Sequence, residues 1–307
     1  MRLPHWRFVH STIATLSIVF ALLPASGAGA ASFSWSPGRP SGPNCGATVY
    51  KANGTPWTCT FADEFSGNSL DTTKWSPITT ASTGLTDGGD CYVNSPNNVS
   101  VSGGYLHLTV RQEAQPFTCN SPYGSFTTQY TGGSVTTSNK FSQTYGLFAV
   151  RAAFPASVTA GLQSSLWLYP QKPSYGAWPA SGEIDIAEQY SLYPDRAIPY
   201  VHYTYDQSQV DSLSNLNVVT NNYCMIDDVT AFHTYQVEWD PGTITISYDG
   251  QTCLVDDYQS AQGGTAPFNQ PFFMTLTQAL GIGTNAVQPG VTPLPATTTV
   301  DWVHIWK

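Results

Sequence analysis

The chain has 307 residues, of which only 10% are charged, and it carries a formal net charge of −9. Because such an acidic chain is repelled by phosphate groups and anionic lipids, we expect neither nucleic acid nor a membrane surface as its partner. Gly, Ser, Thr, Tyr and Trp are abundant, which favours short strands joined by turns over helices.

The first 30 residues have the order of a secretory signal peptide. Arg2 and Arg7 precede an apolar stretch over residues 13–23, and a run of small residues extends to Ala30. The apolar stretch is shorter than the ~20 residues that span a bilayer, so we favour cleavage near Ala30 over a membrane anchor. The prediction is a secreted, extracellular protein. Loss of Arg2 and Arg7 changes its net charge from −9 to about −11.

Residues 31–53 are rich in Ser, Pro and Gly, and we expect an extended N-terminal segment there. Residues 54–307 are long enough for one large functional domain. Six cysteines follow the predicted cleavage site, an even number that is typical of disulfide bonds formed in an oxidising compartment. Sequence alone allows fifteen connectivities; we predict that neighbours pair in chain order, as Cys45–Cys59, Cys91–Cys119 and Cys224–Cys253.

Runs with the character of β-strands recur along the domain, and turn formers such as 240–242 and 249–250 separate them. No convincing helix lies between them. The pattern predicts an all-β fold, a β-sandwich of jelly-roll type with two antiparallel sheets. The predicted strands are 105–111, 133–138, 146–154, 164–168, 183–189, 200–205, 234–239, 243–248, 272–278 and 298–306.

Three acidic residues, Glu183, Asp185 and Glu188, lie within one predicted strand of a chain that is otherwise poor in charge. Side chains alternate along a strand, so Glu183 and Asp185 share a face, whereas Glu188 falls on the opposite face. A single β-bulge moves every later residue to the other face, and bulges are frequent beside active sites. We therefore predict a bulge at residues 186–187.

With this bulge, Glu183 and Glu188 are roughly 13 Å apart along the backbone at ~3.3 Å per residue, and side chains that lean inward bring their carboxyl groups to about 5–6 Å. That separation is typical of glycosidases that retain the anomeric configuration through a covalent intermediate. Neighbouring negative charges push pKa values apart. We assign Glu183 as nucleophile and Glu188 as general acid and then base, with Asp185 hydrogen-bonded to Glu183. A solvated acidic face and a calcium site are the alternatives.

The acidic segment resembles the E-x-D-x-x-E signature of glycoside hydrolase family 16, in the bulged form of laminarinase-like endo-β-1,3-glucanases. Other segments that resemble this family follow in its order and extend nearly to the end of the chain. They include Phe61-Ala62-Asp63-Glu64-Phe65, residues 70–75, 104–108, 145–155 and 232–239, and Val300-Asp301-Trp302-Val303.

The resemblance implies a concave sheet that binds a glucan chain, and it implies the same roles for the three carboxylates. It also implies that Trp178 stacks on a sugar, because an indole ring offers a flat apolar face to the C–H groups of the sugar. Alternation leaves open whether Trp167 faces the cleft. His202 is expected to hydrogen-bond near the acid/base, and Gln278 to reach a sugar hydroxyl.

Several members of the family carry a structural calcium ion. The residues at the corresponding positions here are Glu64, the backbone carbonyl of Gly104, and Asp301. Calcium prefers six or more oxygen ligands, so we expect at most a stabilising ion and no cofactor for catalysis.

Departures from the family pattern concern the walls of the cleft. Gln163 and Tyr203 stand where relatives have Trp and Gly, and the late loop 281–285 lacks a tryptophan. The predicted function is hydrolysis of internal linkages in a β-glucan, with β-1,3-glucan as the leading substrate and mixed-linkage glucan, a galactan or another wall polysaccharide as alternatives. Transglycosylation and non-catalytic glucan binding are the alternative functions. We expect a monomer.

Overall fold

The computed structural model describes residues 42–204 and 218–307. The predicted signal peptide and residues 31–41 of the predicted segment 31–53 lie outside these residues. No described helix is long or apolar enough to cross a membrane. The strands are β1 (Cys59–Asp63), β2 (Ser76–Pro77), β3 (Cys91–Tyr92), β4 (Val99–Ser102), β5 (Tyr105–Cys119), β6 (Phe126–Thr136), β7 (Gly146–Ala153), β8 (Leu162–Pro170), β9 (Glu183–Tyr190), β10 (Ile198–His202), β11 (His233–Asp240), β12 (Thr243–Tyr248), β13 (Gln251–Asp256), β14 (Phe272–Leu280) and β15 (Ala296–Trp306).

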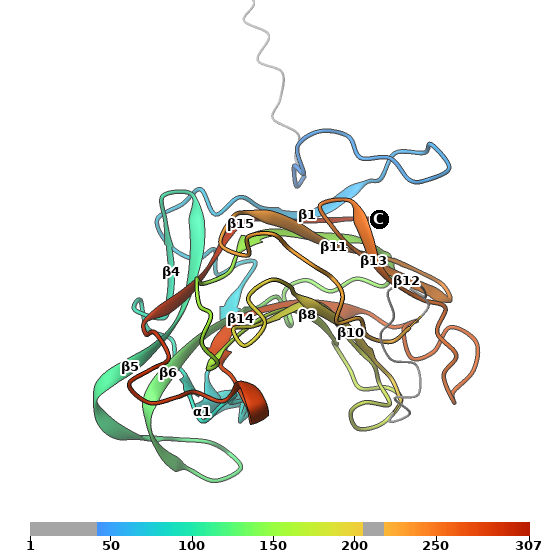
Figure 1. The fold of residues 1–307 in the computed structure, drawn as a ribbon. Helices are drawn as coiled ribbons and strands as arrows, with labels where there is room; N and C mark the ends of the chain where they lie inside the picture. Colours follow the sequence, from blue (N-terminus) through green and yellow to red (C-terminus); the bar gives the residue numbers. More distant parts are fainter. Residues whose placement is uncertain (1–41, 205–217) are drawn as a thin grey trace, which may run out of the picture. The chain divides into compact units, whose positions relative to one another are not determined.

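The strands form two layers, and the predicted all-β sandwich is confirmed (Figure 1). One layer has the strand order β10-β9-β8-β14-β6, and the other has the order β5-β15-β7-β11-β12-β13. Strands β5 and β6 pair with each other and so connect the two layers. The described helical segments are short, namely α1 (Thr80–Thr83) and a 3-10 turn at Gly283–Asn285.

The core lies between the two layers and is made of the apolar side chains that alternate along each strand. Completely buried Leu, Ile and Val side chains from both layers form one cluster, and each contributes about 1.5–3 kcal/mol through its burial. Examples are Leu166, Ile184 and Leu276 from one layer and Val150, Val237 and Val300 from the other.

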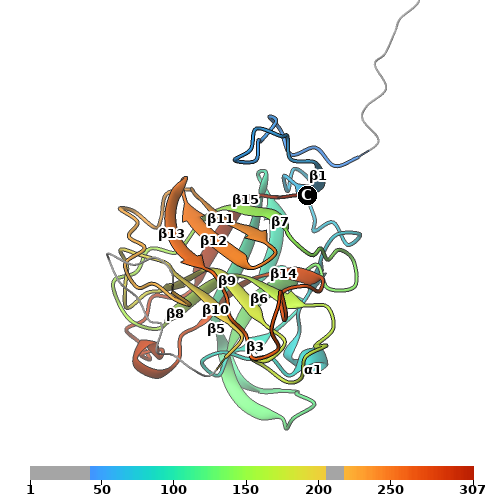
Figure 2. The ribbon, with the colours of Figure 1, turned by 90° about the vertical axis from the view of Figure 1, so that its right-hand side faces the viewer.

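The three disulfide bonds pair neighbouring cysteines in chain order, as predicted: Cys45–Cys59, Cys91–Cys119 and Cys224–Cys253. The first bond ties the described part of the N-terminal segment to β1. The second joins β3 to the end of β5, at a hairpin of β5 and β6 that extends beyond the two layers near α1 (Figures 1 and 2).

Candidate active site

Strand β9 contains the bulge that side-chain parity requires. Its neighbour β8 pairs Leu166 with Ala187 and the next residue, Trp167, with Asp185, so Ile186 is the extra residue. The pairing with β10 shifts over the same part of β9. Ile186 and Ala187 are both completely buried in the core. The predicted bulge at residues 186–187 is therefore confirmed.

Beyond the bulge, Glu188 returns to the face that carries Glu183 and Asp185. All three carboxylates line one cavity, which we call the inner cavity, on the face of the sheet that points away from the core. Figure 2 shows β9, from which all three arise, close to β8 and β10. Strands β8 and β14 and the loop around β3 supply other lining side chains, among them Gln163, Ser165, Trp167, Thr277, Asp87 and Tyr92.

Glu183 and Asp185 lie beside an aromatic group and a histidine. The indole Nε1 of Trp178 donates a hydrogen bond to Glu183 Oε2. His202 stands opposite Glu183 in the pairing of β9 with β10, and its Nε2 lies 3.1 Å from Asp185 Oδ2. The imidazole ring also stacks on Tyr200, with 3.8 Å between ring centroids. His202 therefore lies beside Glu183 and Asp185, whereas the family resemblance implies a hydrogen bond near the acid/base Glu188.

The hydrogen-bonding partners of Glu188 are residues that sequence reasoning did not assign. Gln163 Nε2 on β8 donates to Glu188 Oε1 at 2.9 Å. The hydroxyl of Tyr190 also hydrogen-bonds Glu188. Tyr190 follows Glu188 by two residues, so strand alternation places both side chains on the same face. This alternation could have identified Tyr190 from the sequence. Gln163 comes from another strand, and only the pairing of β8 with β9 reveals it.

Burial dominates the electrostatics of the three carboxylates. It raises the pKa of Glu188 to about 8, and the neighbouring charge of Asp185 acts in the same direction, while the hydrogen bonds from Tyr190 and Gln163 oppose it. Burial also raises the pKa values of Glu183 and Asp185. It lowers the pKa of His202. A cluster of this kind holds at least one proton at neutral pH, because close negative charges in a desolvated site oppose each other's ionisation.

The two predicted aromatic residues border the site. Trp178 is 46% exposed, and Trp167 is half-buried with its indole Nε1 3.2 Å from Thr277 Oγ1. Both line a second cavity of about 570 Å³ together with Tyr169 and Glu183. We call this the outer cavity. It shares Trp167 and Glu183 with the inner cavity, so the two are continuous, and together we call them the cleft. Trp167 thus faces the cleft, which alternation had left open.

The prediction that Gln278 reaches a sugar hydroxyl is wrong. Its side chain is completely buried between the two layers, where its Oε1 accepts hydrogen bonds from Ser164 Oγ and Thr298 Oγ1, both at 2.7 Å. Its neighbour Thr277 faces the cleft instead. Alternation along β14 therefore points Gln278 inward, where it connects strands of both layers.

Two of the three predicted calcium ligands, Glu64 and Asp301, contact basic side chains. Glu64 Oε1 contacts His304 Nε2, and Arg151 donates to Asp301 Oδ2. Gly104 lies in the turn that precedes β5. Residues 42–204 and 218–307 contain no group of three or more His, Cys, Asp or Glu side chains arranged to hold a metal ion. The calcium ion at Glu64, Gly104 and Asp301 therefore stays a prediction, for a stabilising ion with no part in catalysis.

A jelly-roll sandwich whose cleft presents three carboxylates from one bulged strand defines a glycoside hydrolase. A family model described as the GH16 domain of β-porphyranases A–D matches residues 58–307. The chain therefore belongs to glycoside hydrolase family 16, the family indicated by its motifs.

Curated proteins and solved structures show the same relationship. The chain is 31% identical to a β-glucanase of Rhodothermus marinus over 225 residues, which cover 68% of this chain and 70% of the relative. It is 28% identical to glucan endo-1,3-β-glucosidase A1 of Niallia circulans over 260 residues, which cover 80% of this chain but only 37% of that longer protein. The X-ray structure of the laminarinase from Rhodothermus marinus superposes with a TM-score of 0.67 at 27% identity and covers 82% of this chain and 97% of the laminarinase.

Proposed function

We propose that this protein hydrolyses internal linkages of a neutral β-glucan, with β-1,3-glucan as the leading substrate, by a retaining double displacement. The observation that carries this proposal is the bulge in β9, which places Glu183, Asp185 and Glu188 on one wall of one cleft. Two of the relatives are named as a β-glucanase and an endo-1,3-β-glucosidase, which supports the choice of glucan.

In the first displacement, the Glu183 carboxylate attacks the anomeric carbon and the glycosidic C–O bond breaks. Glu188 gives its proton to the departing oxygen. Burial raises the pKa values of Glu188 and Glu183 alike to about 8, so the pair holds a proton at neutral pH, and on Glu188 this proton is the one that a general acid gives. The Trp178 N–H that donates to Glu183 favours the ionised form of this nucleophile, because it hydrogen-bonds a carboxylate.

In the second displacement, Glu188 is the base. It takes a proton from water, the water oxygen attacks the anomeric carbon, and the bond from this carbon to Glu183 breaks. The negative charge on Glu183 changes during both steps, and Asp185 with His202 lies next to it. Because His202 Nε2 and Asp185 Oδ2 are within hydrogen-bonding distance, this pair holds a proton close to the nucleophile and limits the repulsion between Asp185 and Glu183.

The charge of the cleft supports a neutral polysaccharide over a sulfated one. Among the described residues that line its two cavities, Asp87, Glu183, Asp185 and Glu188 are acidic, and none is Lys or Arg. A sulfate group in this cleft meets carboxylates without a cationic partner, which is unfavourable in a partly desolvated site. We therefore place neutral β-glucans ahead of anionic galactans, although the matched family model is named after porphyranases.

We also propose that the protein is secreted. The signal-peptide pattern of residues 1–30 and the three disulfide bonds support export to an oxidising compartment.

The test is a polysaccharide panel assayed with the wild type, Glu183→Gln and Glu188→Gln. The panel contains laminarin, a mixed-linkage glucan, a neutral galactan and a sulfated galactan. We expect the wild type to cut laminarin at internal linkages and each variant to lose on the order of 100-fold or more in kcat. Proton NMR of the first product formed is expected to show the β-anomer, because double displacement retains configuration.

Other outcomes contradict parts of the proposal. Full activity of both variants would show that the catalytic assignment is wrong, and an α-anomer as first product would exclude retention. Products longer than the starting oligosaccharide would indicate transglycosylation. Binding to laminarin without cleavage by the wild type would favour the non-catalytic alternative.

A further inference from the structure

Tyr123 is an exposed aromatic residue at the end of the cleft. It lies in the turn between β5 and β6, and 85% of its surface is exposed. It nevertheless lines the outer cavity, which also contacts Trp178, Trp167 and Glu183. Aromatic rings that line a cleft are typical of ligand-binding sites.

The ring of Tyr123 is seated on Gly84, at the C-terminal end of α1. Gly84 has a φ of 78°, and a Cβ atom built on it would lie 2.3 Å from two carbon atoms of the Tyr123 ring. Only a glycine allows the ring to approach the backbone so closely. The contact leaves most of the ring surface open while Gly84 supports the rest.

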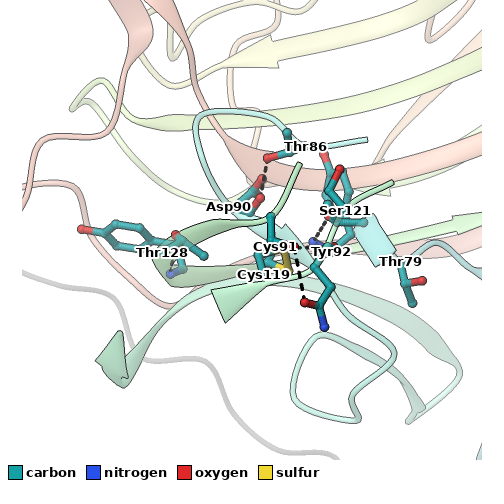
Figure 3. The surroundings of a disulfide bond; sticks show 12 residues. Thr79, Thr86, Asp90, Cys91, Tyr92, Cys119, Ser121 and Thr128 are labelled. Carbon is teal, nitrogen blue, oxygen red and sulfur yellow. Dashed lines mark hydrogen bonds between the residues drawn. A yellow bond between two sulfur atoms is a disulfide. The ribbon is translucent and has the colours of Figure 1, made fainter. Parts of the chain in front are cut away.

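The position of Tyr123 relative to the catalytic carboxylates is fixed by covalent and polar links. The disulfide bond Cys91–Cys119 joins the end of β5 to β3, where the next residue, Tyr92, lines the inner cavity. Figure 3 shows this bond among the segments that carry Tyr92 and Ser121. Thr128 Oγ1 on β6 also donates to the carbonyl oxygen of Gly89 at 2.7 Å. The hairpin turn is therefore tied to the wall of the cleft.

We propose that Tyr123, seated on Gly84 and held by the Cys91–Cys119 bond, is a sugar-binding platform of a distal subsite. It stacks on one ring of the neutral glucan chain whose scissile linkage lies at Glu183 and Glu188. The occupant follows from continuity, because the outer cavity is part of the cleft that receives the substrate. An aromatic ring binds a neutral sugar through its apolar C–H face. This inference rests on the proposed function and adds a length requirement to it.

The test compares substrates of increasing length. For Tyr123→Ala, we expect kcat/KM on laminarin to fall about 3- to 10-fold, the size of one aromatic contact. The loss should shrink on oligosaccharides too short to reach the distal subsite. Tyr123→Phe should keep most of the activity because it keeps the ring. The matched control is Tyr50→Ala, a 63% exposed tyrosine that lines neither cavity of the cleft.

A second pair of variants tests the seat of the ring. Gly84→Ala and Gly54→Ala both place a side chain at a similar positive φ, 78° and 80°, but nothing lies within 4 Å of the built Cβ of Gly54. Only Gly84→Ala should reproduce the length-dependent loss of Tyr123→Ala.

The results separate this inference from the proposed function. A wild type that cuts no β-glucan would refute the proposed function, and the inference with it. A wild type that cuts laminarin, together with a Tyr123→Ala variant whose loss is absent or equal at every substrate length, would overturn the distal subsite alone.

Discussion

Replacing Glu188 with glutamine should inactivate the enzyme and stabilise its fold. Burial raises the pKa of Glu188 from its ordinary value of 4.5 to about 8. Below about pH 4.5 the carboxyl group is protonated in both the folded and the unfolded chain, so its burial has no ionisation cost. As pH rises towards 8, the unfolded chain loses this proton before the folded chain does, and the free energy of unfolding falls.

The magnitude follows from the two pKa values. Between pH 4.5 and pH 7, over about 2.5 pH units, Glu188 is ionised in the unfolded chain but mostly protonated in the folded chain. This difference lowers the free energy of unfolding at pH 7 by about 3 kcal/mol. Glutamine does not ionise, and its amide oxygen can still accept the hydrogen bond from Gln163. We therefore expect Glu188→Gln to raise the free energy of unfolding by up to about 3 kcal/mol at pH 7, and by much less near pH 4.

Urea denaturation of both proteins from pH 4 to pH 8 measures this difference. The control is Asp227→Asn, which removes an exposed carboxylate that lines neither cavity of the cleft. It should change the free energy of unfolding by less than about 0.5 kcal/mol. A difference between Glu188→Gln and wild type that does not grow with pH would refute the reasoning, because the cost of burying an ionised carboxylate must depend on pH.

Two further variants probe the surroundings of the site. Gln163→Leu removes a hydrogen bond that lowers the pKa of Glu188. The protonated form of Glu188 then persists to higher pH, so the alkaline limb of the kcat/KM profile should move to higher pH. An alkaline limb that stays in place or moves to lower pH would contradict this. Replacing both Cys91 and Cys119 with serine removes a disulfide bond between residues 28 positions apart. Urea denaturation under non-reducing conditions should show a free energy of unfolding lower by about 3–4 kcal/mol. Unchanged stability would show that the bond does not constrain the unfolded chain.

The sequence predicted the features that depend on strand alternation within one segment. Parity along residues 183–188 required a bulge, and the structure has Ile186 as the extra residue in β9. The role expected for Gln278 came from the family resemblance and not from this rule. Alternation along β14 puts Gln278 on the same face as Met274, Leu276 and Leu280, which is the buried face. The inward face here holds a polar pair, Gln278 with Ser164, in place of another apolar contact.

Contacts between strands that are distant in sequence could not be predicted in this way. Gln163 meets Glu188 because β8 pairs with β9, and Asp87 reaches the inner cavity on a loop that precedes β3. Both depend on register and loop path, which local propensities do not determine. For the same reason the partner of Asp185 is a histidine on β10, at the position opposite Glu183 in the pairing of the two strands.

The bulge also links the geometry of the site to its proton chemistry. Because Ile186 and Ala187 both point into the core, the backbone between Asp185 and Glu188 is held against completely buried apolar side chains. Glu188 then lies on the other face, in the inner cavity, where its own burial is the largest cause of its raised pKa. A regular strand would turn Glu188 towards the core and remove it from the cleft. One extra residue therefore places both glutamates in the cleft, where Glu188 holds the proton that the first displacement needs.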